Sequence, residues 1–104
     1  MTKPSISLAT HLPEVGAILN RAGMTNPRLF GSVARRDDSS NSDLDILVDV
    51  PSGTTLFDLA EAEMAIERLL SCKVELLTVG FLAPDVAMRA ERDMIPLDTF
   101  ARMT

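Results

Sequence analysis

The segment from Leu44 to Val50 constrains the fold most, because its side-chain character alternates from one residue to the next. Successive side chains of a β-strand point to opposite faces of the sheet. One face of this strand carries only apolar side chains, namely Leu44, Ile46, Val48 and Val50. The other face carries Asp43, Asp45, Leu47 and Asp49. The apolar face has to lie on the core, which fixes the register and turns the two carboxylates of Asp43 and Asp45 away from it.

Helical and strand patterns alternate along the rest of the chain. Helices are expected at 12–22 (ended by Gly23), 32–36, 56–71 and 84–92, further strands at 28–31 and 74–79, and an edge segment at 94–97. Met64, within the third of these helices, is expected in the core. This order predicts an α/β (α+β) fold in which helices pack on a small mixed sheet.

The chain has 104 residues, of which 46% are hydrophobic and 24% are charged. These values are those of one globular domain, so we expect a single domain over residues 1–104, with residues 1–9 as a loose arm. The single cysteine, Cys72, excludes an internal disulfide and favours a reducing, cytoplasmic setting. No apolar run is long enough for a membrane span, and a net charge of −5 argues against non-specific nucleic-acid binding.

The carboxylates of Asp43 and Asp45 are the first candidates for chemistry. Residues i and i+2 of a strand lie roughly 6.5 Å apart at Cα on one face. Two adjacent carboxylates are costly unless a cation joins them, and Mg²⁺ bound through one or two carboxylates plus substrate phosphates is a common solution. Taken alone, this triplet is also compatible with a solvated strand end.

The dipeptide Gly31-Ser32 follows a predicted strand and opens a short predicted helix. A glycine at such a point lets the backbone approach a ligand closely, and Ser32 could cap the helix and donate to a phosphate. Arg35 lies one turn further on and could bind a phosphate through two donors. The alternative for Arg35 is a surface ion pair with Asp37 or Asp38.

These residues together resemble a known family. A strand, Gly31-Ser32, ten intervening residues and Asp43-x-Asp45 at the start of an apolar strand resemble the nucleotidyltransferase fold of DNA polymerase beta. Within that superfamily the segment GSVARRDDSSNSDLDILV is similar to the minimal nucleotidyltransferase (MNT) proteins. The matching positions are Gly31, Ser32, Ala34, Arg35, Ser42, Asp43, Asp45, Leu47 and Val48. The family usually has a third acid, an aspartate, on the next strand, and here Glu75 stands at that position.

The resemblance implies a magnesium-dependent nucleotidyl transfer from ATP. It implies that Gly31, Ser32, Arg35 and Ser42 bind the nucleotide. It implies that Asp43, Asp45 and Glu75 are the catalytic, metal-binding carboxylates, with two Mg²⁺ ions. Glu is one methylene longer than Asp, so the third position stays open between a functional acid and a surface glutamate.

The resemblance also implies a partner. Small MNT proteins are typically paired with a HEPN-domain ribonuclease toxin, and the MNT protein acts as an antitoxin that adenylylates a tyrosine of the toxin. A hetero-oligomer is therefore expected, with no membrane and no direct nucleic-acid contact. Two alternatives stay open: a non-enzymatic antitoxin that neutralises its partner by binding, and a nucleotidyltransferase subunit acting on a small molecule or RNA.

Overall fold

The computed structural model describes residues 2–81 and 84–104. Its centre is a four-stranded sheet with the strand order β3-β2-β1-β4. The strands are β1 (Thr25–Phe30), β2 (Leu44–Asp49), β3 (Val74–Leu77) and the two-residue β4 (Ile95–Pro96). The sheet is mixed, because β1 runs antiparallel to β2 and to β4, whereas β3 runs parallel to β2. This architecture confirms the fold class expected from the sequence.

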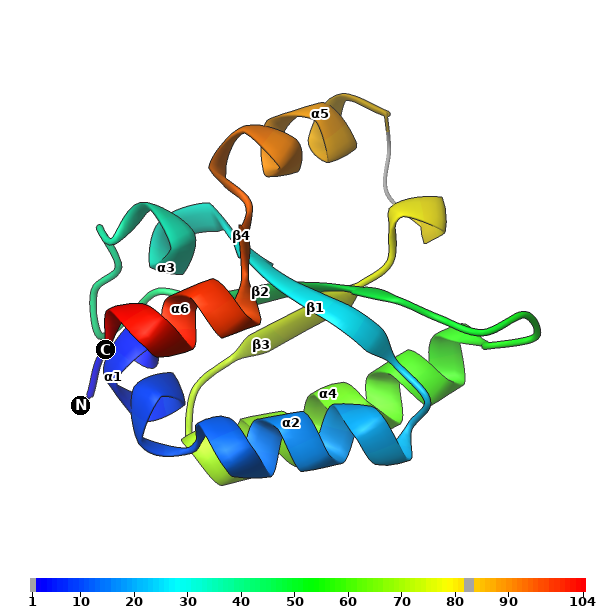
Figure 1. The fold of residues 1–104 in the computed structure, drawn as a ribbon, viewed down its shortest axis with the longest axis horizontal. Coiled ribbons are helices and arrows are strands. Elements are labelled where there is room, and N and C mark those ends of the chain that lie inside the picture. The colour runs from blue at the N-terminus through cyan, green and yellow to red at the C-terminus, as the bar shows by residue number, and fades with distance from the viewer. Residues whose placement is uncertain (1, 82–83) are drawn as a thin grey trace.

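Two helices cover the apolar face of the sheet. Figure 1 shows α2 (Leu12–Arg21) and α4 (Leu56–Leu70) side by side below the strands. The expected alternation of β2 is present, because Leu44, Ile46 and Val48 are fully buried in this core. Burying an aliphatic side chain contributes roughly 1.5–3 kcal/mol, so this face fixes the register of β2 and the direction of its carboxylates.

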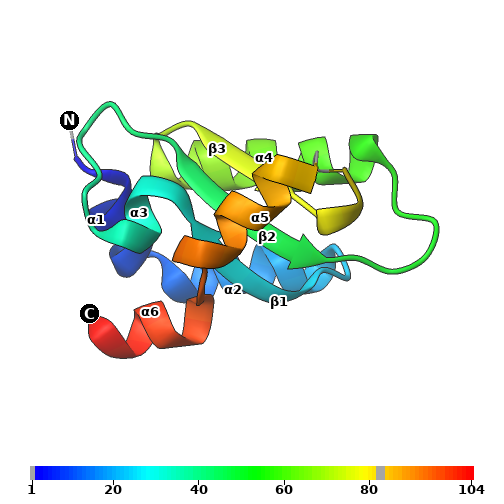
Figure 2. The same cartoon turned by 90° about the horizontal axis from the view of Figure 1, so that it is seen from above.

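The opposite face of the sheet is only partly open. Figure 2 shows α5 (Pro84–Asp93) lying across the sheet, and α3 (Gly31–Arg35) follows directly from the end of β1. Leu47, on the acidic face of β2, is 1% exposed and forms a small second core with Phe30, Leu77 and Met94. This face of β2 is therefore half-buried at Asp43 and Asp45, covered at Leu47 and exposed at Asp49.

Two helices lie outside the expected pattern. Residues 1–9 were expected as a loose arm, but α1 (Pro4–Thr10) is helical and buries Leu8 completely. The backbone N–H of Ser5 donates to the buried carboxylate of Asp38 at 3.0 Å, which holds α1 against the loop after α3. The second is α6 (Leu97–Met103), which anchors Leu97 and Phe100 in the main core. A 3₁₀ turn, η1 (Val79–Phe81), follows β3.

The N-terminus of α4 is capped by side chains, whereas the cap expected for α3 is absent. Thr55 and Asp58 form a reciprocal capping box at the start of α4. Ser32 does not cap α3: the N-cap is Phe30 and has no side-chain cap bond, because Gly31 with φ +73° already begins the helix.

One apolar side chain of α4 also differs from the expectation. Met64 is 52% exposed rather than in the core, because it points away from the sheet on the outer side of α4. Among the described residues, no helix is both long and apolar enough to span a bilayer.

Candidate active site

The carboxylates of Asp43, Asp45 and Glu75 come from adjacent strands. In the parallel register of β2 and β3, Asp45 lies directly beside Glu75, and on its other side it lies opposite Phe30 at the end of β1. Asp43 immediately precedes β2 and shares the side-chain face of Asp45. The fold therefore gathers the three acids that the sequence suggested, although Glu75 is 30 positions away from Asp45 in the chain.

Gly31 closes one side of this carboxylate group. Its φ is +73°, a left-handed conformation that residues with a Cβ rarely adopt. A Cβ built on Gly31 would collide with the Oδ2 atom of Asp45. Glycine is thus favoured here for two reasons, the backbone conformation and the close approach of a carboxylate.

The pKa of Asp45 is raised by its burial and by the neighbouring carboxylates. Burial of this side chain, together with the neighbouring carboxylates of Glu75 and Asp43, raises its pKa from the usual 3.8 to about 6. The positive charge of Arg35 opposes this rise. Arg35 is therefore near enough to influence Asp45.

Arg35 extends from the last turn of α3 and forms two ion pairs. Its Nε donates to Asp37 Oδ2 at 3.3 Å, and its Nη1 donates to Asp93 Oδ2 at 3.1 Å. The pair with Asp37 was one of the expected alternatives, whereas sequence reasoning missed Asp93. No local pattern identifies Asp93, since it reaches Arg35 only because α5 packs beside α3. A guanidinium has five N–H donors, so these two bonds leave capacity for a phosphate.

Ser42 and Asp49 have local partners. The hydroxyl oxygen of Ser42 accepts from the backbone N–H of Ser39 at 2.9 Å, which shapes the turn before Asp43. Asp49, at the far end of β2, accepts from Arg28 Nη1 at 2.9 Å and from Asn26 Nδ2 at 3.1 Å. These two bonds lower the pKa of Asp49 below its usual value, so its chemistry is separate from that of Asp45.

The donor set fits a cation that is shared with a substrate. Among the described residues, no group of three or more ligating side chains is arranged as a ready-made metal cage. Mg²⁺ does not require one, because it usually keeps several waters and binds through one or two carboxylates together with substrate phosphates. Asp43 and Asp45 supply hard oxygen ligands of this kind, and burial together with the neighbouring carboxylates raises the pKa of Asp45.

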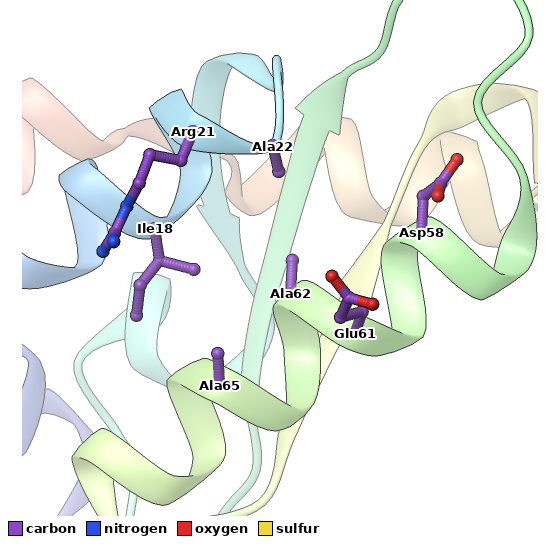
Figure 3. Close-up of a pocket in the computed structure, with 7 residues that line it drawn as sticks. All are labelled: Ile18, Arg21, Ala22, Asp58, Glu61, Ala62 and Ala65. Carbon is purple, nitrogen blue, oxygen red and sulfur yellow. The ribbon is translucent and has the colours of Figure 1, made fainter.

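A separate hollow lies on the other face of the sheet. Figure 3 shows it between α2 and α4, with Ile18, Arg21 and Ala22 on one wall and Asp58, Glu61, Ala62 and Ala65 on the other. It contains none of the three acids of the candidate site. The candidate site is thus a surface of converging strand ends and not this hollow.

The fold and this arrangement define a class. A Gly-Ser turn at the end of one strand, facing an Asp-x-Asp pair and a third acid on the next strand, is the arrangement expected of nucleotidyltransferases. A family model described as the nucleotidyltransferase domain matches residues 21–97 of the chain. The chain belongs to this family, which confirms the resemblance seen in the sequence.

Curated relatives narrow the comparison. The chain is 32% identical over 75 residues to the protein adenylyltransferase MntA of Thermococcus cleftensis, which covers 72% of this chain and 76% of that protein. It is 36% identical over 67 residues to a Methanocaldococcus jannaschii protein provisionally named protein adenylyltransferase MJ0435, covering 64% of this chain and 72% of that protein.

Solved structures agree on the fold. A structure provisionally described as a minimal nucleotidyltransferase superposes with a TM-score of 0.76 at 36% identity, covering 88% of this chain and 94% of that one. A toxin–antitoxin structure with AMP-PNP gives a TM-score of 0.73 at 18% identity, covering 88% and 81%. A complex of the tri-AMPylated Shewanella oneidensis HEPN toxin with its MNT antitoxin gives 0.67 at 16% identity, covering 90% and 80%.

Proposed function

We propose that this nucleotidyltransferase transfers AMP from ATP to a hydroxyl of a partner protein, a tyrosine of a HEPN-domain toxin, and so acts as an antitoxin. The observation that carries the proposal is the convergence of Asp43, Asp45 and Glu75 beside the left-handed Gly31. The names of the adenylyltransferase relatives support AMP transfer to protein. The chain itself contains no tyrosine, so a tyrosine acceptor has to come from another molecule.

In this proposal, the residues at the start of α3 bind the triphosphate. Gly31 lets the Asp45 carboxylate approach the start of α3 closely, while the Ser32 hydroxyl and Arg35 donate to phosphate oxygens. Ser42 shapes the turn before Asp43 through its bond with Ser39, and in this proposal its hydroxyl also contacts the nucleotide. The transfer forms a bond between the acceptor oxygen and the α-phosphorus, breaks the bond to the β-phosphate and releases pyrophosphate.

The carboxylates have distinct parts in this transfer. Asp43 and Asp45 would hold Mg²⁺, two ions in the full site, and the metal supplies neutralisation of phosphate charge when it is bound. Glu75 lies beside Asp45 on the neighbouring strand β3, and its carboxylate accepts the proton of the acceptor hydroxyl. Its extra methylene, compared with aspartate, extends the carboxylate further from the strand.

The decisive experiment combines the chain, ATP with Mg²⁺, and a co-expressed HEPN-domain protein. Intact-mass spectrometry should show one or more added AMP units on the partner with the wild-type chain. Glu75→Gln should abolish the modification, whereas Glu75→Asp should retain much of it, because it keeps a carboxylate. A partner that is neutralised but unmodified by the wild-type chain would contradict AMP transfer and favour an antitoxin that acts by binding. AMP found on RNA or a small molecule instead would favour the other alternative.

A further inference from the structure

The outer face of α4 carries a stripe of side chains that the fold does not use. Phe57, Ala60, Glu61, Met64 and Arg68 lie on one side of the helix and line a hollow of about 310 Å³, and we call this set the α4 stripe. Their spacing of three and four residues places them on one helical face. Phe57 is 77% exposed and Met64 is 52% exposed, which is unusual for two large apolar side chains in one patch.

The inner face of α4 and the flank next to β3 are already occupied. Leu59, Ile66 and Leu70 are buried in the main core. On the flank, Glu63 Oε2 accepts from the backbone N–H of Leu76 at 2.9 Å, and Glu67 Oε2 accepts from that of Val74 at 3.0 Å. The α4 stripe is therefore the side of the helix that faces away from the core and from β3, and its side chains remain available for contact with another molecule.

The two glutamates also restrict how another molecule can bind. β3 is an edge strand, and an edge strand normally offers unpaired N–H groups for strand addition. Glu63 and Glu67 satisfy two of these groups on β3. The other edge, β4, has two residues, and one of them is Pro96, which has no N–H. Neither edge of the described sheet therefore offers a free row of N–H groups to an added strand. Another molecule would have to bind through side-chain surfaces instead.

The charges of the α4 stripe are self-complementary. Glu61 and Arg68 lie two turns apart, on either side of Met64, about 10 Å from each other along the helix axis and too far apart to pair within one helix. In an antiparallel, two-fold pair of helices, each residue meets its counterpart in reverse order. Placing Glu61 opposite Arg68 of a second copy forms two equivalent ion pairs, one on each side of the two-fold axis. The same register brings Met64 next to Ala65 of the second copy near that axis.

We propose that the α4 stripe is a homodimer interface in which two α4 helices pack antiparallel, with Glu61 paired to Arg68 of the second copy around a centre formed by Met64. Figure 1 shows α4 below the sheet and α5 above it, so this dimer leaves the carboxylate face of each copy accessible. The inference goes beyond the proposed function and is tested without nucleotide or partner protein.

Sedimentation velocity of the full chain over about 1 µM to 1 mM tests the dimer. An interface made by one helix per copy is smaller than the standard size of about 800 Å² per partner, so we expect a reversible, concentration-dependent dimer. Met64→Glu should leave the chain monomeric throughout this range. Ile6→Glu is the matched control, because Ile6 is 54% exposed but lies on α1, and it should dimerise like the wild type. Both substitutions are at exposed positions, and circular dichroism checks that each variant is folded.

A charge exchange tests the proposed register. Glu61→Arg and Arg68→Glu each place like charges opposite one another, so each single variant should weaken dimerisation at least tenfold. The double variant restores the opposite charges in reverse and should recover most of the lost affinity. A wild-type chain that stays monomeric, a Met64→Glu variant that dimerises normally, or a double variant weaker than both singles would overturn the proposal. A monomeric chain whose binding to a HEPN-domain protein is lost in Met64→Glu would also overturn it, and would assign the α4 stripe to the heteromeric partner.

Discussion

At the scale of single residues, the site depends on two residues that lie against each other, Gly31 and Asp45. Gly31 has a left-handed backbone, and its missing Cβ leaves the space that the Asp45 carboxylate occupies. Asp45 is itself crowded by Glu75 and Asp43, which raises its pKa. Functional sites often contain such unfavourable local arrangements, which the surrounding fold maintains.

Gly31→Ala should lower both stability and activity. The left-handed conformation costs a residue with a Cβ roughly 1–2 kcal/mol, and the collision with Asp45 adds to this, so urea unfolding should show a loss of at least that size. AMP transfer should fall more than stability does, because the methyl group displaces the carboxylate. Gly16→Ala is the control: a Cβ there meets nothing within 4 Å. Since Gly16 lies within α2, its replacement should stabilise the chain by about 0.5–1 kcal/mol. Equal effects of the two substitutions would contradict this account.

Asp45 should make stability depend on pH in a specific window. Its folded-state pKa of about 6 lies above its usual 3.8, so the ionised carboxylate opposes folding above pH 6. This cost disappears as the pH falls from about 6 to about 4, because the folded chain then binds the proton more tightly than the unfolded chain does. Asp45→Asn should therefore be more stable than the wild type at pH 8, with an advantage that shrinks through this window. Thermal unfolding between pH 4 and pH 8 measures it, and an Asn variant less stable at pH 8 would refute the assignment.

At the scale of elements, α3 and α5 are joined through one side chain. Arg35 pairs with Asp37 just beyond its own helix and with Asp93 at the end of α5. Both pairs are partly exposed to solvent, so neither contributes much to overall stability. Their importance is positional, since the pair with Asp93 holds α5 beside the helix that begins at Gly31.

Asp93→Asn should loosen α5 without unfolding the protein. Loss of the ion pair removes a charged link between α5 and α3, so amide hydrogen exchange over residues 84–93 should become faster. The melting temperature should barely change, because the pair is solvent-screened. Asp37→Asn provides the matched control, since it removes the other ion pair of Arg35 but leaves α5 attached, and it should not alter exchange in α5. Unchanged exchange in Asp93→Asn would show that packing alone holds α5.

At the scale of the whole molecule, the sequence predicts what periodicity and local chemistry determine. The alternation in β2 predicted the correct register, and the resemblance to a known family carried by Gly31, Ser32, Asp43 and Asp45 indicated the correct class of protein. Such patterns could not predict contacts between residues that are far apart in the sequence. α1 is held by Leu8 and by the bond from Ser5 to Asp38, and the ion pair of Arg35 with Asp93 forms only after α5 packs. Met64 was expected in the core, although its spacing from Ala60 and Arg68 places it on the face of α4 opposite the buried one, where it is 52% exposed.

The central claim also concerns the whole molecule: Asp43, Asp45 and Glu75 form one metal-dependent nucleotide site beside Gly31. Titration calorimetry with AMP-PNP, which cannot be used up by transfer, measures this most directly. We predict that the wild type binds AMP-PNP with Mg²⁺ but loses at least tenfold in affinity with EDTA, and that Asp45→Asn loses a similar factor in the presence of Mg²⁺. Asp49→Asn, on the same face of β2 but paired with Arg28, should bind like the wild type. Binding that is unaffected by EDTA, or equally strong in Asp45→Asn, would contradict the claim.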